Sequence, residues 1–71
     1  MPNFDVDKVF TYHAPHGDQA ERYENIRAAA RYFVSVAQGY TPASREQSLG
    51  FTAVQEAVMW FNASIAINEA E

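Results

Sequence analysis

The sequence predicts an all-α protein, an antiparallel two-helix hairpin with an extended N-terminal arm that assembles into a compact homo-oligomer. Apolar residues recur at helical spacing in two stretches, at about residues 18–38 and 44–68, and these predict two long helices. Only a short connection separates them, and short connections make neighbouring helices antiparallel. The 71 residues are expected to form one helical-hairpin domain over residues 1–71, with the arm at 1–17.

The arm is expected to be extended, with space for one helical turn near its start. An alternation of apolar and charged residues there is too short to specify a strand. Pro15 favours extended backbone at Ala14, and Gly17 ends the segment with a flexible position. Such an arm packs either on its own domain or on a neighbouring chain.

The first helix has recognisable signals at both ends. Asp18 is a good N-cap, because its carboxylate can accept from backbone N–H groups of the first turn, and Glu21 can reach back in a capping box. Gly39 suits the left-handed position that often follows a helix. One apolar stripe runs along the helix through Tyr23, Ile26, Ala30, Phe33, Val34 and Ala37.

The second helix is apolar around most of its circumference. Ser44 can cap it, with Gln47 at the reciprocal position of a capping box. Leu49, Trp60 and Ile67 share one direction, and a second direction holds Val54, Val58, Phe61 and Ile65. One partner helix cannot cover both directions, so we expect this helix to lie in the middle of an oligomer.

Composition excludes several classes of protein. The formal net charge of −4 argues against binding of a DNA or RNA polymer, and against a helix-turn-helix DNA binder. No apolar stretch approaches the roughly 20 residues needed to span a bilayer. The N-terminus lacks the basic start and apolar run of a signal peptide, so an intracellular protein is expected. With no cysteine, the chain has neither disulfides nor a thiolate metal site.

Enzymatic chemistry is not expected either. His13 and His16 form an HxxH pair, but no third and fourth ligand accompanies them, so no metal site is predicted. The chain has no Ser–His–acid signature and no Gly-rich phosphate loop. We therefore expect no catalytic residue, no cofactor and no reaction.

A few residues around the arm–helix junction could instead bind a planar, anionic ligand. Tyr12 either packs on the hairpin or stacks on a nucleobase, and His13 lies beside it. Arg22 and Arg27 lie at the two edges of the apolar stripe. Each either extends its stem over the core or makes a forked contact to a phosphate. The residues alone leave both interpretations open.

The run FTYHAPHGDQAERYENIRAAA, followed by SREQSLGFTAVQEAVMWFNASIAINE, resembles the hairpin domain of phage cyclic-oligonucleotide sponges. These are immune-evasion proteins of the anti-CBASS and anti-Thoeris types. The similarity covers about residues 10–69, and the order and spacing of its short blocks make it specific. Its length matches the single-domain anti-CBASS type.

The resemblance implies a hexamer of hairpins in the host cytoplasm, which sequesters cyclic dinucleotides such as cyclic GMP–AMP between protomers without cleaving them. In the Phe-x-Tyr-His block the base-stacking tyrosine falls on Tyr12. In the Ile-Arg block the residue expected at the phosphates falls on Arg27. Members that also bind cyclic trinucleotides tend to carry a basic residue where this chain has Ile67, which argues against that activity.

A structural or adaptor hairpin is the alternative. In that interpretation the apolar faces of the second helix bind a host protein, because apolarity alone does not distinguish a second copy from a foreign partner.

Overall fold

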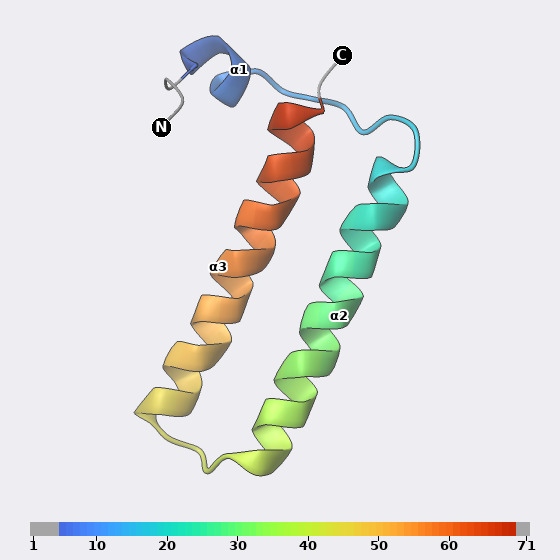
Figure 1. The fold of residues 1–71 in the computed structure, drawn as a ribbon. Coiled ribbons are helices and arrows are strands. Elements are labelled where there is room, and N and C mark those ends of the chain that lie inside the picture. Colours follow the sequence, from blue (N-terminus) through green and yellow to red (C-terminus); the bar gives the residue numbers. More distant parts are fainter. Residues whose placement is uncertain (1–4, 70–71) are drawn as a thin grey trace.

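The computed structural model describes residues 5–69, which form three helices: α1 (Val6–Phe10), α2 (Gln19–Tyr40) and α3 (Arg45–Asn68). Helices α2 and α3 lie side by side and antiparallel, and α1 with the segment after it crosses the open end of the hairpin (Figure 1). The expectation of an all-α fold with two long packed helices is confirmed. The helical turn that was expected near the start of the arm is α1.

Helix α1 is a single short helix with its own cap. The Asp5 carboxylate accepts from the Lys8 backbone N–H at 3.0 Å, and the helix ends where Thr11 turns extended. From Thr11 the chain runs without helix to Gly17, whose φ of 57° turns it into α2. Glycine reaches this left-handed conformation without steric cost.

The predicted capping box at the start of the first helix is wrong. Asp18 is the N-cap residue, but its carboxylate makes no capping hydrogen bond, so the reciprocal pair with Glu21 does not form. A capping side chain needs an extended backbone, whereas Asp18 has a ψ of 10°. Its carboxylate instead lies 3.2 Å from Nε of Arg22. The turn that leads into the helix is closed by the Gln19 N–H, which donates to the His16 carbonyl at 3.1 Å.

The predicted role of Gly39 is also wrong, because the helix continues through it to Tyr40. Within residues 5–69 the left-handed conformation occurs at Gly17, and Gly39 does not adopt it. The Thr41 hydroxyl donates to the Ala37 carbonyl at 2.7 Å, which satisfies one of the carbonyl groups left over at the helix end. Pro42 follows, and proline cannot continue the helix.

Ser44 caps α3 as predicted, since its hydroxyl accepts from the Gln47 N–H at 3.1 Å. The reciprocal half of the predicted box takes a different form. The Gln47 amide donates to the carbonyl and the hydroxyl of Thr41, at 3.2 and 3.0 Å. Gln47 thus ties the start of α3 to the end of α2.

The hairpin does not close a hydrophobic core of its own. Within residues 5–69 no hydrophobic side chain is buried, and Val54, Val58 and Ile65 are half-buried where the two helices meet. The accessible surface is 5772 Å², whereas a compact monomer of this mass would expose roughly 4,500 Å². The radius of gyration, 15.2 Å, likewise exceeds the value of about 11 Å for a compact chain of this length.

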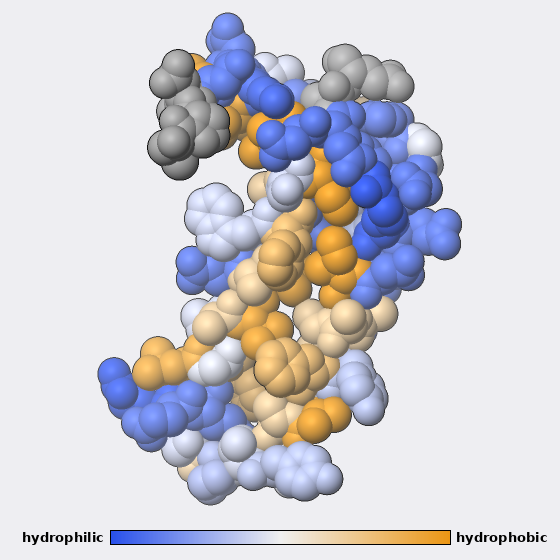
Figure 2. Space-filling view, in the orientation of Figure 1, coloured by the Kyte–Doolittle hydropathy of each residue, from blue (hydrophilic) through white to orange (hydrophobic). Residues whose placement is uncertain are grey.

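Much of the unburied surface is apolar. Figure 2 shows a hydrophobic band along one face of the hairpin, with hydrophilic residues gathered toward its two ends. The large apolar side chains left exposed on the two long helices are Tyr32, Phe33, Val36, Tyr40, Leu49, Met59, Trp60 and Phe61. No helix within residues 5–69 is long and apolar enough to cross a membrane.

The Ser44 cap yields a stability test. Ser44→Ala removes the acceptor for the Gln47 N–H and is expected to lower the free energy of unfolding by about 1 kcal/mol. Ser48→Ala, one turn further along α3, is the matched control and should be neutral or slightly stabilising, because alanine favours helix. Thermal unfolding at equal protomer concentration measures both. Equal melting temperatures for Ser44→Ala and the wild type would contradict the assignment of the cap.

Candidate functional site

The non-helical part of the arm forms one wall of a hollow at the open end of the hairpin. The hollow has a volume of about 290 Å³, and Gln19 of α2 and Ala66 of α3 close its other side. From the arm it is lined by Tyr12, His13, Ala14, Pro15 and His16. Two of the residues predicted to bind ligand, Tyr12 and His13, therefore lie together here.

Tyr12 and His13 differ in how firmly they are held. The Tyr12 side chain is exposed, with 83% of its residue surface accessible, so its ring is open to a stacking partner. The His13 ring is half-buried, and Nε2 lies 2.7 Å from the Lys8 carbonyl oxygen, to which it donates. Since a neutral imidazole donating from Nε2 has an acceptor at Nδ1, His13 can accept a hydrogen bond from a ligand.

Arg27 lies in a second hollow, also of about 290 Å³, between the two long helices. Tyr23 lines it from α2, and Asn62, Ala63 and Ala66 line it from α3. Half of the Arg27 side chain is exposed, and Nη1 is 3.7 Å from the nearest oxygen of Glu24. At that distance the arginine is held loosely.

Glu24 is engaged mainly by another arginine. Its second carboxylate oxygen lies 2.9 Å from Nη2 of Arg31, and this hydrogen bond is the main reason that the pKa of Glu24 is below its ordinary value. The charge on Arg27 contributes less to the lowering. Arg27 is therefore the member of this trio whose guanidinium remains available to an anion.

The two hollows adjoin. Ala66 belongs to both, and on α2 their lining residues Gln19, Tyr23 and Arg27 follow one another at intervals of four. Residues four apart lie on the same face of a helix. Tyr12 and Arg27, which come from different segments of the chain, thus line two neighbouring hollows, which together we call the strip.

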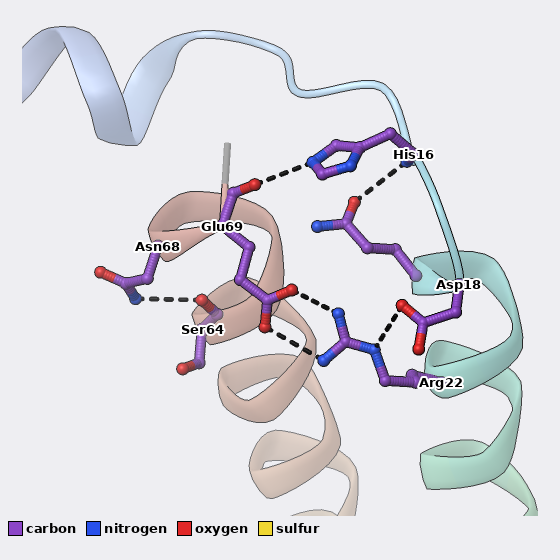
Figure 3. A network of polar contacts seen from close by, with 7 residues as sticks. His16, Asp18, Arg22, Ser64, Asn68 and Glu69 are labelled. Carbon is purple, nitrogen blue, oxygen red and sulfur yellow. Dashed lines mark hydrogen bonds and ion pairs between the residues drawn. The ribbon is translucent and has the colours of Figure 1, made fainter. Parts of the chain in front are cut away.

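Arg22 has a different environment. Its Nη1 donates to Oε2 of Glu69 at 3.0 Å, Nη2 donates to Oε1 of the same carboxylate, and Nε faces Asp18 (Figure 3). The hydrogen bond to Glu69 raises the pKa of Arg22 above its ordinary value. Arg22 therefore links the start of α2 to the end of α3, and its predicted contact with a ligand stays a prediction.

Glu69 and Gln19 also belong to this region, although neither was predicted to be a site residue. Gln19 is the buried polar side chain of the described chain, with 3% of its surface exposed, and its Oε1 accepts from the His16 N–H at 3.1 Å. The antiparallel pairing brings residue 69 next to residue 22, so the opposite charges of Arg22 and Glu69 were an available signal. The residues described bring no three histidine or acidic side chains together in a way that could hold a metal ion.

The paired hydrogen bonds between Arg22 and the Glu69 carboxylate make the stability of the fold depend on pH. The pKa of Glu69 is lowered from 4.5, first of all by its hydrogen bond to Arg22, so the unfolded chain binds the proton more readily than the folded one. Its stabilising contribution is complete above pH 4.5 and is lost as pH falls through the lower pKa of the folded state. Glu69→Gln should lower the melting temperature at pH 7, and the difference from the wild type should shrink as pH falls below 4.5.

Thermal unfolding across this range measures the effect, with Glu46→Gln at the far end of the hairpin as the control for loss of one acidic charge. A melting difference for Glu69→Gln that stays the same at all pH values would contradict the pH dependence.

Comparison with known proteins identifies the family. Residues 1–66 match the family described as Acb2/Tad1, hairpin domain, while no curated protein and no solved structure matches the chain. The matched range includes Tyr12, His13, Arg22 and Arg27. Proteins of this family are phage cyclic-nucleotide sponges, which bind rather than cleave their nucleotide ligands. The resemblance found in the sequence is thus confirmed, and the chain belongs to the Acb2/Tad1 hairpin domain family.

Proposed function

We propose that this protein binds and sequesters cyclic dinucleotides such as cyclic GMP–AMP, and that it releases them chemically unchanged. The observation that carries the proposal is that an exposed tyrosine and a loosely held arginine line two hollows that share Ala66. A cyclic dinucleotide needs both, because it presents flat bases and two phosphates. Sequestration in the host cytoplasm would withhold the second messenger from the effector of a CBASS defence.

Each candidate residue has a role in this proposal. Tyr12 stacks on a base, an interaction worth about 1–3 kcal/mol in base–aromatic pairs. Arg27 makes a forked contact to a phosphate, which guanidinium geometry favours. His13 accepts from a base or ribose through Nδ1, because Nε2 is held by Lys8. Arg22 would have to leave Glu69 to touch a phosphate, so we assign it an indirect role.

The proposed pocket includes a second protomer. Each hollow has about 290 Å³, near the lower limit of the roughly 300–1,000 Å³ of ligand pockets, and each is bounded by one hairpin alone. The exposed apolar surface supplies a reason for protomers to associate. We therefore propose a homo-oligomer with ligand between protomers, and a hexamer as its size.

The proposal is restricted to cyclic dinucleotides. Ile67 is half-buried and apolar, and it stands where a basic residue is expected in sponges that also bind cyclic trinucleotides. An uncharged side chain at that position offers no compensation for a third phosphate.

A stacking residue and a phosphate-binding residue make separable predictions. Tyr12→Ala should weaken binding of cyclic GMP–AMP by about 5- to 150-fold, while Tyr12→Phe should retain most of the affinity because the ring remains. Arg27→Ala should weaken binding by about tenfold or more, since a hydrogen bond to a charged group contributes about 1.5–3 kcal/mol. Isothermal titration measures the dissociation constants.

Tyr40→Ala and Arg45→Ala are matched controls, because both side chains are exposed and lie at the opposite end of the hairpin. Neither should change the affinity. If Tyr12→Ala and Arg27→Ala dissociate the oligomer instead of weakening binding within it, these residues are structural and the assignment of the pocket is overturned.

The proposed assembly is tested by light scattering. A hexamer has six times the protomer mass of 8.0 kDa, or about 48 kDa. A monomer with its apolar faces exposed would contradict the sponge assembly. It would favour the adaptor hairpin, which binds a host protein through those faces.

A further inference from the structure

The part of the arm that carries Tyr12 is tied to α1 on both sides: the Thr11 N–H donates to the Asp7 carbonyl at 3.0 Å, and the His13 ring donates to the Lys8 carbonyl at 2.7 Å. Between the end of α1 and Gly17 the backbone is in neither helix nor strand, and the Tyr12 side chain is almost fully exposed. A stacking residue is effective only when its plane is held where the base will lie, because ordering it on binding costs free energy. The contacts with α1 do not reach the two long helices, so contacts further along the arm must set the position of Tyr12 relative to α2 and α3.

His16 supplies such contacts, and it joins the arm to both long helices. Its backbone N–H donates to Oε1 of Gln19 in α2 at 3.1 Å. Its ring Nε2 donates to the backbone carbonyl oxygen of Glu69, just beyond α3, at 2.8 Å (Figure 3). The arm is thus attached at a point only four residues after Tyr12, and its position depends on where the two helix ends lie relative to each other.

The relative position of those two helix ends is set by Arg22. Its guanidinium holds the Glu69 carboxylate through two donors while Nε faces Asp18, so both ends of the hairpin opening meet at one side chain. The Glu69 N–H also donates to the Ile65 carbonyl at 3.1 Å, which keeps residue 69 aligned with α3. Figure 3 shows His16, Glu69, Arg22 and Asp18 joined in one connected network.

Gln19 is suited to transmit this arrangement to the site. Its side chain is 97% buried, and the same residue lines the hollow that contains Tyr12 and His13. The bond between the His16 N–H and the buried Gln19 amide oxygen is costly to break, because the amide oxygen would be left without a partner away from water. The arm is therefore attached to α2 at the floor of the proposed pocket.

We propose that Gln19, Arg22 and Glu69 are positioning residues for ligand binding, which hold the arm through His16 so that Tyr12 faces the ligand. This inference rests on the proposed function, but it concerns residues that need not touch the ligand. A network that only stabilised the hairpin would change the melting temperature and leave arm dynamics and affinity unaltered.

The test uses two variants. Gln19→Met keeps the length of the side chain but removes the acceptor for the His16 N–H. Glu69→Gln removes the negative charge that pairs with the Arg22 guanidinium. Arg45→Gln is the control, since it removes an exposed ion pair with Glu46 at the far end of the hairpin. Hydrogen exchange of the backbone amides of residues 11–17 is measured in the ligand-free protein. Affinity for cyclic GMP–AMP is measured by titration, and oligomer mass by light scattering.

Gln19→Met and Glu69→Gln are expected to speed exchange in the arm and to weaken binding about two- to tenfold, the range that one hydrogen bond supports, with the oligomer intact. Arg45→Gln should change neither. Unaltered arm exchange in both variants, or faster exchange with wild-type affinity, would overturn the positioning role. If Gln19→Met does not fold, Glu69→Gln decides.

The proposed function can fail separately. A wild-type protein that does not bind cyclic GMP–AMP overturns the sponge assignment for this ligand. Arm exchange in the variants then still decides whether the network anchors the arm.

Discussion

Two long helices packed along a single seam cannot surround a core, and this geometric limit governs the molecule. Each helix buries only the stripe that faces its neighbour, so the side chains in the seam, such as Val54 and Val58, remain half-buried. Directions of α3 that point away from α2, which hold Leu49 and Trp60, stay open. A chain of this size in water lowers its free energy by covering that surface, and a second copy has the same surface to offer.

The candidate site follows from the same limit. Because the hairpin is one layer thick, its surface offers strips and shallow hollows rather than an enclosed cavity. The strip that holds Tyr12 and Arg27 lies near the open end, where the arm adds a third element to the two helices. The polar network of His16, Arg22 and Glu69 closes that end. In the proposed assembly a second protomer would cover the strip and enclose the ligand, and assembly would then be coupled to binding.

Much of the fold was predictable, because apolar periodicity, Ser44 and the short connection depend on neighbouring residues. Two predictions about the ends of α2, made from single residues, were wrong. Asp18 has the right residue type for a capping carboxylate, but its backbone angles and the proximity of Arg22 turn the side chain elsewhere. Gly39 was expected to end α2, but Thr41 satisfies the helix end without it. Tyr12 and Arg27 were recognisable as residue types, whereas the roles of Gln19 and Glu69 depend on contacts between segments far apart in sequence.

The central claim is that a hairpin of this family stores a cyclic dinucleotide and does not consume it. The most direct measurement saturates the oligomer with cyclic GMP–AMP, removes free ligand, denatures the protein and identifies the released nucleotide by chromatography and mass spectrometry. The account predicts that bound ligand is recovered in full as intact cyclic GMP–AMP after prolonged incubation. Recovery of a linear dinucleotide, or of no bound nucleotide from an intact oligomer at micromolar ligand, would contradict it.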